Sequence, residues 1–137
     1  MYLTKAVFKV RALTWIIVAL VLSNSVFAGG GQSLNISSSS TQGLAPETLS
    51  ISLDSTEPTE GFVIAVAYDD SMAAVSDLST AGTATESSNA ELIVPEILSG
   101  GFTLGVVVDA DHPFDGHSIP AGTGQALAMV TVTPMAV

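Results

Sequence analysis

Three aspartates in one short stretch are the residues whose types and spacing best suit chemistry. Asp109, Asp111 and Asp115 offer hard carboxylate oxygens, and the Asp-x-Asp spacing lets two side chains converge from one loop. The stretch is not an EF-hand, because Asp115-Gly116 is displaced from where that loop needs its oxygens and its glycine, and no glutamate closes it. The three carboxylates therefore predict a calcium site, with a solvated acidic loop as the alternative.

Two histidines lie in the same stretch. His112 and His117 could suggest zinc or a general base, but they are five residues apart in a Pro/Gly-rich loop and have no third ligand nearby. No serine lies in a Gly-x-Ser-x-Gly elbow, and no glycine-rich loop is followed by a lysine that could hold phosphates. We therefore expect the histidines to be surface residues, and we expect no catalytic site and no cofactor other than the calcium.

The distribution of charge excludes two classes of partner. The three basic residues, Lys5, Lys9 and Arg11, all lie near the start of the chain, and the 13 acidic residues all lie between Glu47 and Asp115. A chain without a Lys/Arg patch in its main part is not suited to nucleic acid or to electrostatic membrane binding. Its carboxylates must be separated, solvated, protonated or neutralised by cations, which favours metal binding. The alternative is that the acidity simply keeps the protein soluble.

The first 28 residues have the pattern of a secretory signal peptide. Three basic residues precede the apolar run 12–22, and Val26-Phe27-Ala28 places small side chains at the positions that signal peptidase reads. The run is shorter than the roughly 20 apolar residues that span a bilayer, so a retained membrane anchor is only the alternative. We expect cleavage after Ala28 and a secreted protein, extracellular or at the cell surface.

One small domain is expected after the signal peptide. About 109 residues remain, and they contain no cysteine, so the core must hold the fold without disulfides. Composition divides them into a flexible lead at 29–32, a domain at 33–134 and a short tail at 135–137. Because the chain ends directly after its last predicted strand, a fragment of a longer protein is a further alternative.

Short runs of alternating or continuous apolar residues predict an all-β domain. The predicted strands cover residues 33–37, 47–55, 61–68, 72–78, 90–98, 101–109 and 125–134. Turn-forming residues separate them, and no long amphipathic helix is visible. About seven short strands of this kind predict an antiparallel, jelly-roll-like β-sandwich of the type seen in cohesin and carbohydrate-binding modules.

Individual stretches allow finer predictions. Residues 61–68 are apolar on both faces, which predicts a central strand that is covered on both sides. Pro95 interrupts the run 90–98 and predicts an edge strand or a bulge, while 80–90 reads as an exposed loop. Asp69 should accept backbone N–H bonds in the turn after the central strand.

The aromatic residues bear on the choice of ligand. Exposed aromatic platforms would favour sugar binding by stacking. Tyr68 and Phe102, however, lie within apolar strands, and the single tryptophan, Trp15, lies in the predicted signal peptide. We therefore expect both side chains to pack in the core, which weakens the carbohydrate interpretation without removing it.

With the strands placed, the chain resembles the cohesin domain over roughly residues 33–134. The resemblance rests on the alternating strand 49–53, on Gly61-Phe62 running through Ala67-Tyr68-Asp69 to Val75, and on Phe102 to Asp109 followed by Ile119-Pro120-Ala121-Gly122 and a last strand, 126–133. The short cohesin-like modules of exported bacterial proteins are the most similar. The resemblance implies a nine-stranded, non-catalytic sandwich whose family members hold dockerin modules on one sheet face.

Two functional hypotheses follow. In the first, the domain is a cohesin-like module that mediates extracellular protein–protein interaction with a dockerin-like partner. In the second, it is a carbohydrate-binding or structural cell-surface domain whose partner is an extracellular polysaccharide. Binding to a polypeptide that survives high salt favours the first, and retention on an insoluble polysaccharide favours the second.

Overall fold

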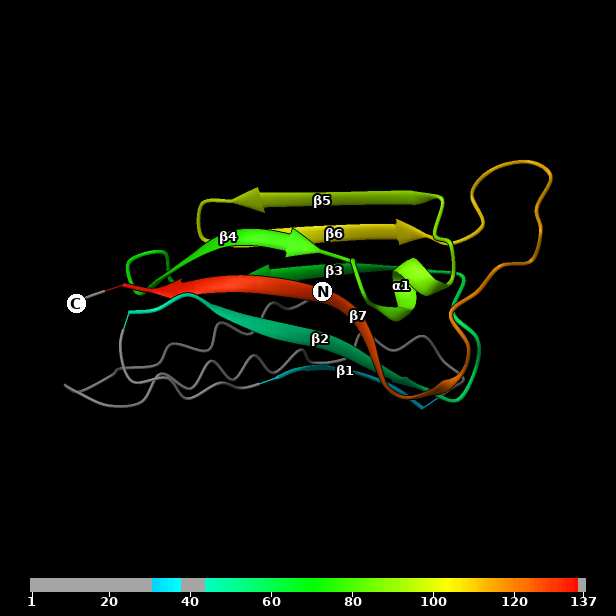
Figure 1. The fold of residues 1–137 in the computed structure, drawn as a ribbon, viewed down its shortest axis with the longest axis horizontal. Coiled ribbons are helices and arrows are strands. Elements are labelled where there is room, and N and C mark those ends of the chain that lie inside the picture. Colours follow the sequence, from blue (N-terminus) through cyan, green and yellow to red (C-terminus); the bar gives the residue numbers. More distant parts are fainter. Residues whose placement is uncertain (1–30, 38–43, 136–137) are drawn as a thin grey trace.

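The chain folds into two antiparallel β-sheets that pack face to face (Figure 1). The computed structural model describes residues 31–37 and 44–135. Its elements are β1 (Gln32–Ile36), β2 (Glu47–Ser55), β3 (Gly61–Ala67), β4 (Ala73–Ser79), α1 (Ala84–Ser87), β5 (Leu92–Leu98), β6 (Gly101–Val107) and β7 (Gly122–Pro134). One sheet has the order β1-β2-β7-β4 and the other β3-β6-β5. The predicted all-β antiparallel sandwich is thus confirmed, with seven strands in the described part of the chain.

Strict alternation makes β2 the clearest strand of the four-stranded sheet. Leu49, Ile51 and Leu53 are buried, while Ser50 and Ser52 lie on the other face and are only half-buried. Side chains of a strand point alternately to its two faces, so the apolar set faces the second sheet. The predicted bounds of this strand, 47–55, are those observed.

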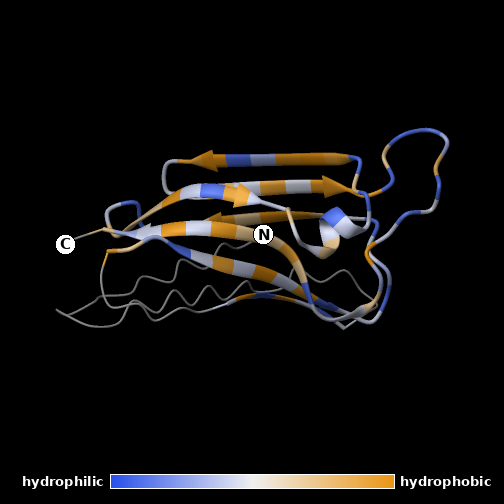
Figure 2. Ribbon diagram, in the orientation of Figure 1, coloured by the Kyte–Doolittle hydropathy of each residue, from blue (hydrophilic) through white to orange (hydrophobic). Residues whose placement is uncertain are grey.

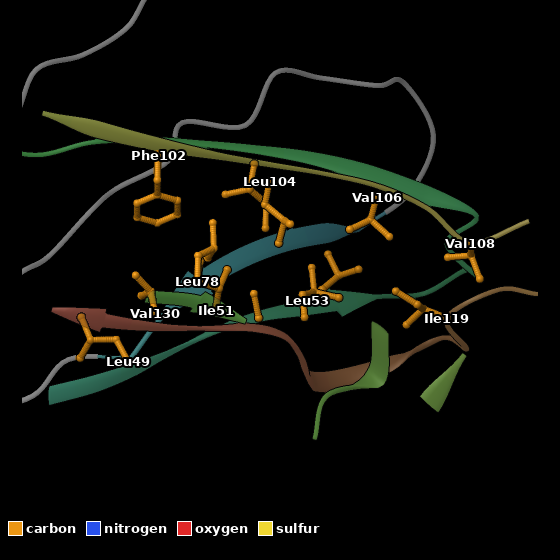
Figure 3. Close-up of a cluster of buried hydrophobic side chains, with 13 residues drawn as sticks. Leu49, Ile51, Leu53, Leu78, Phe102, Leu104, Val106, Val108, Ile119 and Val130 are labelled. Carbon is orange, nitrogen blue, oxygen red and sulfur yellow. The ribbon is translucent and has the colours of Figure 1, made fainter. Parts of the chain in front are cut away.

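The core lies between the two sheets, as Figure 3 shows. Phe102, Leu104 and Val106 project from β6 toward side chains of β2, β4 and β7. The buried cluster consists of Leu49, Ile51, Leu53, Ile64, Leu78, Phe102, Leu104, Val106, Val108, Ile119, Leu127, Ala128 and Val130. In the absence of cysteine, burial of this apolar surface is the main source of stability.

Both aromatic side chains that could have formed a sugar platform take part in packing, as predicted. Phe102 is 3% exposed, and Tyr68 packs against the buried cluster while its hydroxyl donates to the carbonyl oxygen of Leu98 at 3.3 Å.

The prediction of a covered central strand at 61–68 is wrong. β3 lies at an edge of the three-stranded sheet, and β6 is the middle strand. Val63, on the outer face of β3, is 78% exposed. The sequence pattern correctly shows that both faces of the strand are apolar. The outer face, however, is exposed to solvent and is not covered by a further layer of the described chain.

The stretch 80–90, predicted as an exposed loop, contains the single turn α1, and Thr83 and Thr85 are buried there. For 90–98, Pro95 predicted either an edge strand or a bulge. β5 is the first of these, since it lies at an edge and pairs with β6 without a register shift.

The turn after β3 has the predicted form. Asp69 Oδ1 accepts hydrogen bonds from the Ser71 hydroxyl at 2.6 Å and the Ser71 N–H at 2.9 Å. The bond from the Ser71 hydroxyl and, to a smaller extent, the bond from the Ser71 N–H lower the pKa of the Asp69 carboxyl below its ordinary value.

The predicted signal peptide, 1–28, lies outside the described residues. Within the described part of the chain, no helix has the length and apolar character needed to cross a bilayer.

Candidate functional site

The predicted calcium loop is held together by its own backbone. Asp109 Oδ1 accepts the N–H of Asp115 at 3.1 Å, and Asp109 Oδ2 accepts the N–H of Gly116 at 2.7 Å. A neighbouring carboxylate does the same at the start of the loop, where Glu91 Oε2 accepts the N–H groups of Ala110 and Asp111 at 2.7 and 2.6 Å. The side chains of these two acidic residues therefore act as local supports of the chain.

The structure does not bring the three predicted calcium ligands together as a group. Asp111 and Asp115 are exposed, and Asp109 is half-buried beneath the loop that it closes. Among residues 31–37 and 44–135, no three His, Cys, Asp or Glu side chains form a cluster that could hold a metal ion. Calcium binding at Asp109, Asp111 and Asp115 stays a prediction, and the geometry favours the alternative of a solvated acidic loop.

Replacing Asp109 by alanine tests its supporting role. Loss of two hydrogen bonds of about 1 kcal/mol each should speed amide exchange at Asp115 and Gly116 by roughly tenfold or more. Asp111→Ala is the matched control, because the Asp111 carboxylate accepts no hydrogen bond within the described residues. This variant should leave the exchange of both amides unchanged. If millimolar calcium slows their exchange in the wild type but not in Asp109→Ala, the calcium prediction gives the better account.

The two histidines have different environments. His112 is exposed and lies edge-on to Phe114, with ring centroids 5.7 Å apart and planes at 71°. His117 is half-buried, and its Nδ1 is shielded from solvent without a hydrogen-bond partner in the described residues. The prediction of two surface histidines therefore holds for His112 and is wrong for His117.

His117 lines a hollow between α1, the end of the long loop and the start of β7. The hollow has a volume of about 560 Å³. Its lining residues are Gly82, Thr83, Ala84, Ser87, Ser88, Asn89, His117, Ser118, Pro120, Gly124, Gln125 and Ala126. The lining contains no Asp, Glu, Lys or Arg, and no large aliphatic or aromatic hydrocarbon side chain. The hollow therefore suits a neutral polar molecule better than an ion or an apolar ligand.

Two buried threonines fix one wall of this hollow. The hydroxyls of Thr83 and Thr85 both donate to the carbonyl oxygen of Leu127, at 3.1 and 2.8 Å. The short helical turn α1 is thereby attached to β7, although a single turn has little intrinsic stability.

The outer face of the three-stranded sheet exposes several large apolar side chains. Val63 of β3 is 78% exposed, Val94 of β5 is 53% exposed, and Val107 of β6 is 39% exposed. Figure 2 shows the predominance of apolar residues along these strands. β5 contributes three exposed apolar side chains to this face, Leu92, Val94 and Leu98.

Strand register shows how this face is built. In successive rows across β3, β6 and β5 the outward positions are Gly61, Val107 and Leu92; Val63, Gly105 and Val94; Ala65, Thr103 and Glu96; and Ala67, Gly101 and Leu98. The middle strand supplies Gly101 and Gly105 together with Thr103 and Val107, and a Cβ at Gly105 would meet nothing within 4 Å. The larger apolar side chains of the face are Val63, Leu92, Val94, Leu98 and Val107, and Glu96 is its one charged residue. We call these positions the apolar face.

The outer face of the other sheet is polar by contrast. Asp54 Oδ2 accepts bonds from Ser33 at 3.3 Å and from Asn35 at 3.4 Å, across β1 and β2. Between β2 and β7, the hydroxyls of Thr48 and Thr131 lie 3.5 Å apart. Short hydroxyl and amide side chains that bond to one another leave this surface well suited to water.

Comparison with protein-family models, with curated proteins and with solved structures finds no match to this chain. Its function must therefore be argued from the surfaces described above. The apolar face was readable in the sequence, since the outward residues of 61–68 are apolar, but only the sheet order shows that nothing in the described chain covers them.

Proposed function

We propose that the protein is a secreted, non-catalytic interaction module that binds a protein partner on the apolar face. The observation that carries this proposal is the contrast between the two outer faces. The three-stranded sheet exposes Val63, Val107 and three residues of β5 on its outer face, whereas the outer face of the other sheet carries Ser, Thr and Asn side chains. Exposed apolar patches of this kind mark sites of association.

The charge of the chain limits the partner. From Gly29 onward the chain carries no Lys or Arg, so a second copy would bring only carboxylates to the interface. A different protein that offers apolar side chains for this face and a basic side chain for Glu96 is complementary. The resemblance to cohesin-like modules supports a dockerin-like protein as this partner.

Capture of a partner from the extracellular fraction of the source organism, with the purified protein as bait, tests the proposal. Val94→Asp places an unpaired charge on the β5 side of the apolar face and should weaken binding at least tenfold, which is about 1.4 kcal/mol. Thr48→Asp adds the same charge to the polar face and should bind as the wild type does. Equal binding by both variants would show that the partner docks elsewhere.

The same capture, repeated with calcium and with a chelator, addresses the metal. A calcium requirement that remains when Asp109 of the bait is replaced would belong to the partner. Binding that persists at high salt would agree with an apolar interface, since screening weakens interactions between exposed charges but not apolar burial.

A second candidate function rests on the neutral hollow beside α1. Hydroxyl, amide and imidazole groups can form hydrogen bonds with sugar hydroxyls, so this hollow favours the carbohydrate-binding alternative. Its lining lacks an aromatic platform, and we therefore expect weak, millimolar binding. Retention on an insoluble polysaccharide that is lost in Gln125→Ala, and unchanged in Val94→Asp, would support this function over protein binding.

A further inference from the structure

Within residues 31–37 and 44–135, four strands form the edges of the two sheets, and three of them carry features that disfavour further pairing. β5 has Pro95 and Glu96 in its middle, β4 has Asp77 and a register shift beside it, and β1 is only five residues long. Proline, charge, irregular register and short length are the usual protections of a sheet edge. β3 has none of them: Gly61–Ala67 contains no proline and no charged residue, and it pairs with β6 at seven successive positions without a shift.

Hydrogen bonds at the two ends of β3 show which backbone groups reach its open edge. The N–H of Val108 donates to the Glu60 carbonyl oxygen at 2.8 Å, and the N–H of Tyr68 donates to the Gly100 carbonyl oxygen at 3.0 Å. In an antiparallel pair, alternate residues bond to the partner strand. Residues 60, 62, 64, 66 and 68 therefore face β6. The N–H and C=O groups of Gly61, Val63, Ala65 and Ala67 point to the open edge.

We propose that an extended segment of the protein partner adds to the open edge of β3 as a further strand. This inference rests on the proposed function, because it concerns how the same partner binds. Gly61, Val63, Ala65 and Ala67 also provide the β3 side of the apolar face. A strand added beside β3 would place every second side chain on that face, so the edge and the face form one continuous surface.

Charges at both ends of β3 specify the segment further. Glu60 precedes the strand and Asp69 and Asp70 follow it, and all three are exposed. Antiparallel pairing of β3 with a second copy would set Glu60 near these aspartates of the other copy, and the like charges would repel one another. Neither copy has a Lys or Arg after residue 11 that could offset this repulsion. The complementary segment has small or β-branched residues in its middle and a Lys or Arg toward each end.

Amide hydrogen exchange with a synthetic peptide tests the proposal directly. The probe is a peptide of about ten residues that alternates threonine and valine between terminal lysines. The amides of Val63, Ala65 and Ala67 should exchange rapidly in the free protein and at least tenfold more slowly with the peptide. The amides of Ile64 and Val66, already bonded to β6, serve as internal controls. Rapid exchange of the three open-edge amides at millimolar peptide would overturn the proposal.

One substitution removes the open edge with little change to the pairing of β3 and β6. Ala65→Pro deletes an N–H that faces outward, as Pro95 already does on the open side of β5. It should weaken binding of the peptide, and of the captured partner, at least tenfold. A peptide that is N-methylated at alternate residues provides the same test without altering the protein, and one such isomer should fail to bind the wild type. Binding of both isomers as tightly as the parent peptide would contradict strand addition.

The variants separate this inference from the proposed function. If the captured partner is lost in Val94→Asp but binds Ala65→Pro normally, the partner docks on the apolar face without adding a strand, and only the inference is overturned. If neither variant affects the partner, both are overturned. Protection of the open-edge amides that rises with protein concentration, in the absence of peptide, would identify a second copy as the occupant and overturn the assignment to a different protein.

Discussion

Replacement of Leu104 by alanine is expected to lower the free energy of unfolding by about 3 kcal/mol. Leu104 is 0% exposed and lies on β6, the middle strand of its sheet, where it projects into the core (Figure 3). Truncation removes buried apolar area and leaves a cavity that the surrounding strands can fill only in part. For a small domain whose whole stability is about 5–15 kcal/mol, this is a large fraction.

Leu92→Ala is the matched control for this prediction. The same three carbon atoms are removed, but Leu92 is 48% exposed on the apolar face. Its loss should cost less than about 1 kcal/mol. Urea denaturation followed by far-UV circular dichroism measures both values. Similar midpoints for the two variants would mean that the sheets are not packed together as described.

Gly101→Ala is expected to destabilise the protein by about 2 kcal/mol, because β3 and β6 approach closely at this point. A Cβ at Gly101 would lie 2.9 Å from the Val66 carbonyl oxygen, which is too short for an unstrained contact. The neighbour is backbone, so it cannot rotate away as a flexible side chain could. The methyl group must therefore push the two strands apart and weaken their hydrogen bonds.

Gly105→Ala separates this steric effect from the general effect of removing a glycine. Gly105 lies on the same strand and the same face, but its Cβ would meet nothing within 4 Å. Alanine there should be neutral or stabilise the fold by up to about 1 kcal/mol, since it restricts the unfolded chain. The midpoint of thermal unfolding should therefore fall in Gly101→Ala. In Gly105→Ala it should stay the same or rise. Equal destabilisation would count against the close approach.

Local patterns in the sequence predicted most of the strands. The alternation of Leu49, Ile51 and Leu53 with serines fixed both the bounds and the buried face of β2. Pro95 correctly placed β5 at an edge, because proline cannot donate to a ladder on both sides. These features depend on residues that are close in sequence, and a single chain displays them fully.

Local sequence patterns do not predict the order of the strands within a sheet. Residues 61–68 and 101–109 have the same apolar character on both faces, yet β6 became the middle strand and β3 an edge. Hydropathy reports what a side chain prefers and not what lies above it. Burial of Thr83 and Thr85 was likewise hidden, since it depends on the carbonyl group of Leu127, more than 40 residues away.

The candidate site was predicted less well than the fold. The acidic stretch around Asp109 was recognised, but its composition could not show that the carboxylate accepts N–H bonds from its own loop. The sequence predicts His117 at the surface because it lies in a Pro/Gly-rich loop without a periodic face and without a third metal ligand nearby. Only the packing of the loop against α1 and β7 places the imidazole in a hollow.

The position of β7 has a consequence for the order in which the protein can fold. β7, the last strand of the chain, lies between β2 and β4, and β4 has no other neighbour in its sheet. β7 leaves the ribosome after β2 and β4, so the four-stranded sheet has no centre until β7 has emerged. Contacts between such distant segments also close slowly. We therefore expect this domain to fold as one unit once β7 is available, rather than strand by strand as the chain emerges.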